Sequence, residues 1–146
     1  MGPLYPGEQP ADESERQVRL SIRNQCLLAR SYATAGFVPL LDYPVVTRRS
    51  LDRYRRALAG LDQYLVVLHP GREVALRRDR ERPEKTVAEH WVHMEDELIR
   101  ELTGVGLWIE SGALTVEQTV EAILCQRARA GLGNEGVPPP LSEPEA

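Results

Sequence analysis

The apolar positions of the chain fall into two patterns, helical spacing and short continuous runs. From about residue 12 to residue 35, apolar residues recur every three or four positions, which predicts one long helix. Asp12 or Ser14 can cap its start, and Gly36 suits the position past its end. Three continuous apolar runs follow, at residues 37–41, 64–68 and 107–110, and we expect each of them to form a strand.

Helical patterns separate and follow these runs. One runs from about residue 50 to residue 59 and stops at Gly60, and one runs from residue 72 to residue 82 and stops at Pro83. Two capping boxes, at residues 86–89 and 115–118, open the last two helices, which reach about residues 102 and 130. Because strands alternate with helices, the sequence predicts an α/β fold with a parallel sheet between helices.

The two ends of the chain differ from its middle. Residues 1–11 hold three prolines and two glycines and are expected to be irregular. Residues 131–146 contain Pro138, Pro139 and Pro140 and are expected to form a disordered tail. Since the whole chain has 146 residues, this leaves one folded domain over residues 12–130.

Composition and charge argue against several classes of partner and site. The net charge of −4 and the pI of about 5.4 argue against a nucleic-acid partner, because such proteins usually present a basic surface. No apolar run approaches the length of a membrane span, so we expect no membrane partner and a cytoplasmic location. Two cysteines, Cys26 and Cys125, are too few for a disulfide framework or an all-cysteine zinc site.

Candidate chemistry lies where the predicted strands end, since ligands of open α/β sheets bind beyond the carboxyl ends of the strands. Asp42 follows the first run and could hold a metal-bound water or accept a proton, or it could simply cap a loop. The arginine-rich helix after the second run places Arg78 and Arg82 on one face, suited to phosphate oxygens or to solvent-exposed ion pairs. His90 and His93 lie three residues apart, but the pattern favours solvated side chains over a zinc site.

The small number of lysines excludes one common nucleotide-binding motif. Of the 18 basic residues, 17 are arginine, and the single lysine, Lys85, follows Glu84. The chain therefore contains no G-x-x-x-x-G-K-[ST] phosphate-binding loop.

An extended stretch nevertheless resembles a known family. Residues 65–124 read LVVLHPGREVALRRDRERPEKTVAEHWVHMEDELIRELTGVGLWIESGALTVEQTVEAIL. They are similar to the C-terminal half of small P-loop kinases, in the bacterial group that includes chloramphenicol phosphotransferase-like proteins, often labelled AAA-family ATPases. Residues 27–46 resemble the middle helix and strand of that family. The similarity extends over about residues 15–130.

The resemblance implies a P-loop-kinase sheet in three layers and ATP-dependent phosphoryl transfer, with Mg²⁺, to a small hydroxyl compound. Arginines at three positions match those of the family's lid, and the carboxylate after the first run matches a position near metal or substrate. The loop after the third run matches the position beside the adenine. The implied site residues are Arg78, Arg80, Arg82 and Asp42 for catalysis, and Ser111, Gly112 and Leu114 for the nucleotide.

The family's opening strand, phosphate loop and helix have no counterpart in this sequence. The expected fold is thus an N-terminally truncated P-loop kinase with strands at 37–41, 64–68 and 107–110. We expect this short chain to be inactive as a kinase. The missing strand leaves two strand edges open, or the remaining strands pair directly, and in either case we expect marginal stability or self-association through the open sheet. Two alternatives stay open: a non-catalytic module that binds a nucleotide or a protein, and a small α/β binding module for another ligand.

Overall fold

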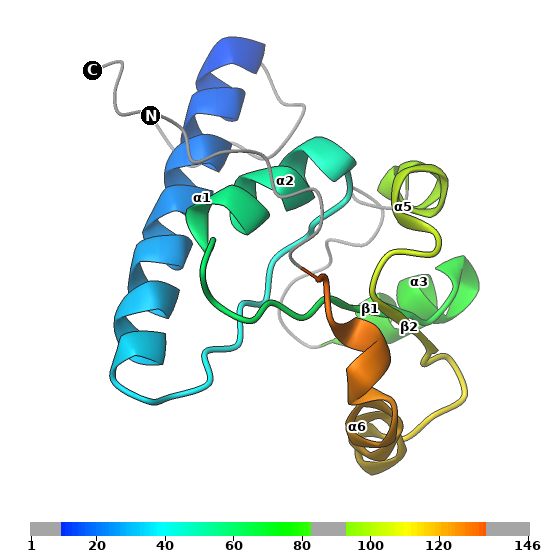
Figure 1. Ribbon diagram of the computed structural model, residues 1–146. Coiled ribbons are helices and arrows are strands. Elements are labelled where there is room, and N and C mark those ends of the chain that lie inside the picture. Colours follow the sequence, from blue (N-terminus) through cyan, green and yellow to red (C-terminus); the bar gives the residue numbers. More distant parts are fainter. Residues whose placement is uncertain (1–9, 83–92, 134–146) are drawn as a thin grey trace. The chain divides into compact units, whose positions relative to one another are not determined.

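A computed structural model describes residues 10–82 and 93–133 (Figure 1). The chain divides into two compact units. Within the described ranges, the first unit comprises residues 10–44 and 49–61, and the second comprises residues 45–48, 62–82 and 93–133. Each unit has its own elements and its own buried residues, and each is described separately.

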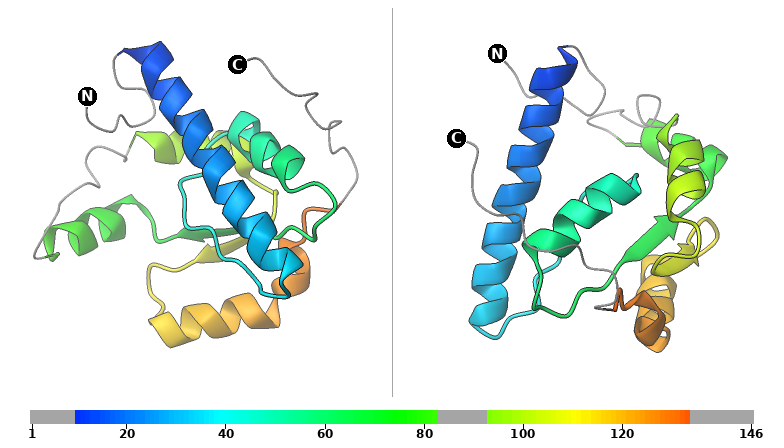
Figure 2. Two further views of the ribbon diagram at one scale, coloured as in Figure 1. Left: turned by 90° about the vertical axis from the view of Figure 1, so that its left-hand side faces the viewer. Right: turned by 45° about the horizontal axis from the view of Figure 1, so that its top comes forward.

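The first unit consists of two helices that lie side by side in Figures 1 and 2, α1 (Ala11–Thr34) and nearly all of α2 (Arg48–Ala57). α1 confirms the long helix that the spacing of apolar residues predicted over residues 12–35. The Tyr54 hydroxyl donates to Gln25 Oε1 at 3.1 Å, and Arg30 Nη2 donates to the carbonyls of Ala57 and Ala59, each at 2.9 Å. These bonds link the two helices across a set of buried apolar side chains, namely Ile22, Cys26, Ala29, Leu51 and Tyr54.

The predicted strand at residues 37–41 is wrong. Residues 37–46 have no regular secondary structure, and within the described residues this run pairs with no strand. Val38 and Leu40 are 88% and 95% exposed, so the run buries little apolar surface. Pro39 has no N–H to donate to a ladder. Without a partner strand or a core to cover, an apolar run has no reason to adopt regular pairing.

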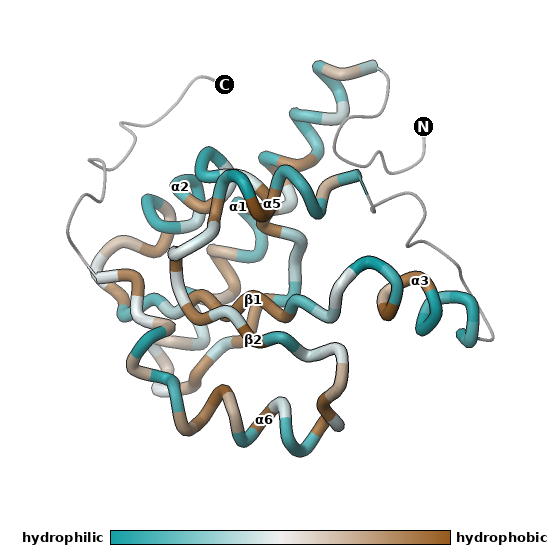
Figure 3. Tube along the Cα trace, turned by 90° about the vertical axis from the view of Figure 1, so that its right-hand side faces the viewer, coloured by the Kyte–Doolittle hydropathy of each residue, from teal (hydrophilic) through white to brown (hydrophobic). Residues whose placement is uncertain are grey.

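The second unit contains a parallel pair of strands, β1 (Val66–His69) and β2 (Leu107–Glu110), in the register Val66↔Leu107 to His69↔Glu110. Its helices are α3 (Arg72–Arg80), α5 (Met94–Leu102) and α6 (Val116–Cys125), followed by the 3₁₀ turn η1 (Arg127–Ala130). Figure 3 shows apolar and polar residues alternating along α6. The core comprises Leu107, Ile109 and Ala130, with Val66, Leu114, Ala122 and Ile123 packed against it.

The structure is therefore mixed α/β with a two-stranded parallel sheet, not the three strands expected. The strand at 107–110 is confirmed, and the strand expected at 64–68 starts later, at Val66. Residues just before β1 instead pair with the end of the unit, since Leu65 N–H donates to Ala130 O at 2.8 Å and Leu132 N–H donates to Gln63 O at 2.9 Å. In the described residues, β1 and β2 pair directly with each other.

Local signals account for several boundaries of the second unit. The Thr115 hydroxyl accepts from Gln118 N–H at 3.2 Å, and Gln118 Oε1 accepts from Thr115 N–H at 2.9 Å, which confirms the second capping box. Gly106 enters β2 with φ of 70°, and a Cβ there would lie 2.6 Å from Leu65 O, so a larger residue does not fit. The first capping box, at residues 86–89, falls outside the described residues. Most of the irregular start expected at 1–11 and of the tail expected at 131–146 also falls outside them, but α1 already begins at Ala11, and Leu132 N–H donates to Gln63 O.

Candidate functional site

The carboxyl ends of β1 and β2 lie next to each other because the strands are parallel and in register. The loop after β1 leads into α3, and the loop after β2 leads into α6. The two loops touch: Ser111 N–H donates to His69 O at 3.1 Å, and a Cβ on Gly112 would lie 2.5 Å from Pro70 O. This edge of the sheet is the position at which α/β proteins usually bind ligands.

Arg78 connects α3 to the loop after β2. Its Nη2 donates to the carbonyls of both Ser111 and Gly112, each at 3.2 Å. The structure thus brings one predicted lid arginine together with two residues predicted to lie beside a nucleotide. The guanidinium fixes the backbone of a loop whose first residue, Ser111, is buried.

The other predicted residues of this unit are placed differently. Arg80 is the last residue of α3, Arg82 lies two residues beyond it, and both side chains are exposed. Leu114 packs against the core, and its N–H donates to Ser111 O at 3.3 Å. Leu114 therefore ties the loop to the core of the second unit. The two arginines carry exposed positive charge at the end of α3.

Asp42 was predicted at the end of a strand, and the structure corrects that placement. Residues 37–41 form no strand, so Asp42 follows no strand end, and its side chain is exposed in an irregular segment of the first unit.

A group that the sequence analysis did not assemble lies at the same edge. The His69 ring faces two carboxylates, with Nε2 3.1 Å from Glu95 Oε1 and Nδ1 3.0 Å from Glu110 Oε2. Arg72, the first residue of α3, donates from Nε to Glu95 Oε2 at 2.9 Å and from Nη2 to Asp96 Oδ2 at 3.1 Å. We call His69, Arg72, Glu95, Asp96 and Glu110 the His69 cluster.

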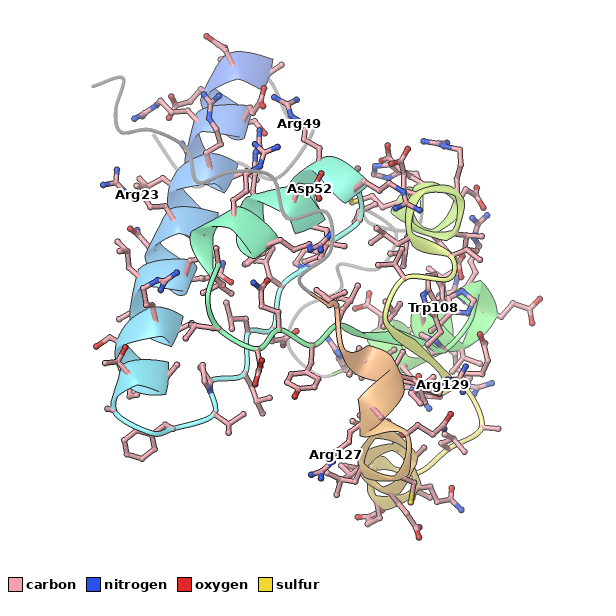
Figure 4. All side chains as sticks on the ribbon, in the orientation of Figure 1. Arg23, Arg49, Asp52, Trp108, Arg127 and Arg129 are labelled. Carbon is pink, nitrogen blue, oxygen red and sulfur yellow. The ribbon has the colours of Figure 1, made fainter. Side chains whose placement is uncertain are left out.

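The cluster favours a protonated histidine. Burial by itself would lower the pKa of His69, but the hydrogen bonds and negative charges of Glu110 and Glu95 outweigh it, and the pKa is raised above its ordinary value of 6.5. The ring of Trp108, labelled in Figure 4, lies against the imidazole with centroids 5.8 Å apart. Sequence could have suggested half of this cluster, because His69 and Glu110 both end apolar runs and the ends of parallel strands meet.

Metal binding finds no support in the described ranges, 10–82 and 93–133. Within them, no group of three or more His, Cys, Asp or Glu side chains is arranged to hold a metal ion. His90, the partner considered for His93, lies outside these ranges. The described residues likewise include no helix long and apolar enough to cross a bilayer.

Comparison of the chain with protein-family models, with the curated proteins and with the solved structures finds no significant match.

Proposed function

We propose that this chain carries the arginine-bearing and adenine-side part of an ATP-dependent phosphotransferase that acts on a small hydroxyl compound. The observation that carries the proposal is the contact of Arg78 with Ser111 and Gly112. Ser111 and Gly112 lie 33 and 34 positions after Arg78 in the sequence. The resemblance to P-loop kinases assigns all three residues to one nucleotide site.

The arrangement around this contact suits an anionic nucleotide. Parallel pairing places both loops at the carboxyl edge of the sheet, and Arg78 holds the Ser111–Gly112 backbone in a fixed course. The exposed guanidinium groups of Arg80 and Arg82 lie at and beyond the end of the same helix. A guanidinium fork matches phosphate oxygens, and arginine in such a position stabilises the charge of a transferred phosphoryl group.

The fit is limited to the nucleotide side of such a site. Asp42, which the resemblance places near metal or substrate, belongs to the first unit. The described residues contain no group of three or more His, Cys, Asp or Glu side chains that could hold a metal ion. The sequence also lacks the phosphate loop, whose lysine and backbone position the phosphates in such kinases. We therefore expect no ATP turnover by the 146-residue chain alone.

The absence of a phosphate loop from this sequence favours a second candidate function, that of a non-catalytic binding module. With Lys85 as the single lysine and no phosphate loop, the chain could serve as a non-catalytic module that binds a nucleotide or a protein through the same edge. The intact mass of the protein in its native host separates the two. A mass well above 16.4 kDa, with a G-x-x-x-x-G-K-[ST] motif in the added sequence, supports the phosphotransferase, and a mass of 16.4 kDa supports the binding module.

Nucleotide binding itself is tested by NMR on the ¹⁵N-labelled chain, titrated with ATP and, separately, with adenosine. We expect the amide signals of residues 111–114 to shift with ATP, and the Arg78→Gln variant to bind more weakly. Arg100→Gln is the matched control, because Arg100 pairs with Glu97 on the surface of α5 and should leave binding unchanged. Absence of any shift at residues 111–114 at saturating ATP would refute a nucleotide site there.

A further inference from the structure

The imidazole ring of His69 contacts carboxylates from two different elements, α5 and β2. Glu95 belongs to α5 and Glu110 ends β2, and a carboxylate oxygen of each lies within hydrogen-bond distance of one nitrogen of the imidazole. His69 itself ends β1, directly opposite Glu110 in the register. The side chain thus bridges the two strands at their carboxyl ends, beside the backbone bond from Ser111 to His69.

The two contacts can both be hydrogen bonds only when both ring nitrogens of His69 carry a proton. A neutral imidazole has one N–H and one lone pair, whereas the imidazolium has two N–H donors. With carboxylate oxygens 3.1 Å from Nε2 and 3.0 Å from Nδ1, the doubly protonated ring satisfies both sides. Loss of one proton leaves one carboxylate facing a lone pair, which is repulsive.

The exposure of the two carboxylates decides which contact is lost. The Glu95 side chain is 19% exposed, and Arg72 also holds it, so this carboxylate cannot easily turn into water. The Glu110 side chain is 77% exposed, so water can replace the imidazole as its partner. The neutral ring therefore keeps its remaining proton on Nε2, toward Glu95, and releases Glu110.

We propose that His69 is a pH-sensitive clasp across the ends of β1 and β2, closed on Glu110 when the ring is charged and open when it is neutral. Glu110 immediately precedes residues 111–114, so opening removes one restraint from that loop. In the described residues, the groups that face the ring are Glu110 and Trp108 from β2 and Glu95 from α5. Arg72 from α3 and Asp96 from α5 act through Glu95. The clasp does not depend on the proposed function.

The direction of the pH effect follows from the raised pKa. A histidine whose folded-state pKa lies above its unfolded value binds its proton more tightly when folded. The stabilisation by the clasp is fully present below the ordinary value of 6.5 and is lost as the pH rises through the raised pKa. The second unit is thus expected to lose stability, and the loop to lose order, in that window.

The test is an NMR pH titration of the full chain. Long-range ¹H–¹⁵N spectra report the protonation of both His69 ring nitrogens, and ¹H–¹⁵N correlation spectra report the amides of Glu110 and Ser111. We expect both ring nitrogens protonated at low pH, Nε2–H retained at high pH, and a common midpoint for the ring and the two amides. In Glu110→Gln, which removes an exposed charge, the midpoint should fall and the two amides should no longer follow it.

Glu97→Gln serves as the matched control, because Glu97 lies on α5 and pairs with Arg100 instead of His69. Its His69 midpoint should equal that of the unsubstituted chain. The proposal is overturned by a His69 midpoint at or below 6.5, by retention of Nδ1–H at high pH, or by a midpoint unchanged in Glu110→Gln. It is also overturned if the amides of Glu110 and Ser111 titrate independently of the ring.

Discussion

Replacement of Gly112 by alanine tests the close approach of the two loops. The added Cβ would lie 2.5 Å from Pro70 O, 3.4 Å from Pro70 C and 3.6 Å from Val74 Cγ2. The first distance is about 1 Å short of a comfortable non-bonded separation of roughly 3.5 Å. Because the clashing atom belongs to the backbone, the loop after β1 has to move away from the loop after β2.

The expected cost follows from overpacking. Forced insertion of a methyl group into a packed site typically costs about 1–3 kcal/mol. Alanine also restricts the unfolded chain, which returns about 0.4–1 kcal/mol. We therefore expect Gly112→Ala to destabilise the second unit by about 1–2 kcal/mol.

The assay is urea denaturation followed by the fluorescence of Trp108, in a Trp91→Phe background so that one tryptophan reports. Gly131→Ala is the control, because a Cβ on Gly131 would lie 3.6 Å from Ala128 O, an ordinary contact. That variant should match the unsubstituted chain or slightly exceed its stability. If Gly112→Ala proves as stable as Gly131→Ala, the loops do not approach as described and the reasoning fails.

Three further predictions address the capping box, the thiols and the arginines. Thr115→Ala should lower stability by about 1 kcal/mol in the same urea assay, because it removes the side-chain acceptor at the start of α6; an unchanged midpoint would contradict this. Burial raises the pKa of the Cys26 thiol to about 11, so at pH 8 iodoacetamide should alkylate exposed Cys125 and spare Cys26 until urea is added, as mass spectrometry of peptides would show. Arg78→Ala should lower stability by about 1 kcal/mol through loss of its two carbonyl bonds, whereas Arg82→Ala should stay within about 0.5 kcal/mol; equal effects would show that the carbonyl bonds contribute nothing.

Local signals in the sequence predicted the long helix, the start of α6 and the strand at 107–110. The last helix was expected to reach about residue 130, but α6 ends at Cys125 and a 3₁₀ turn follows. The three- and four-residue spacing of α1 and the reciprocal bonds of Thr115 and Gln118 depend on neighbours within one or two turns. The strand at 107–110 was predicted because it begins with a short continuous apolar run, residues 107–109. Such features require no knowledge of distant residues.

The run at 37–41 shows where this reasoning stops. Its composition matches that of a buried strand, yet a strand also needs a partner and a surface to cover, and neither is encoded locally. The same limit applies to the site. The rule for parallel strand ends could have placed His69 near Glu110, but the position of Glu95 depends on how α5 packs, which no spacing within the helix reveals.

The pairing of residues 63–65 with residues 130–132 has a topological consequence. The segment of residues 62–133 begins and ends at adjacent positions, where Leu65 pairs with Ala130 and Gln63 pairs with Leu132. Residues 62–133 thus form a nearly closed ring of backbone, and cutting the chain outside it severs none of these bonds. A short linker could join the two ends covalently, as in circularly permuted or inserted domains.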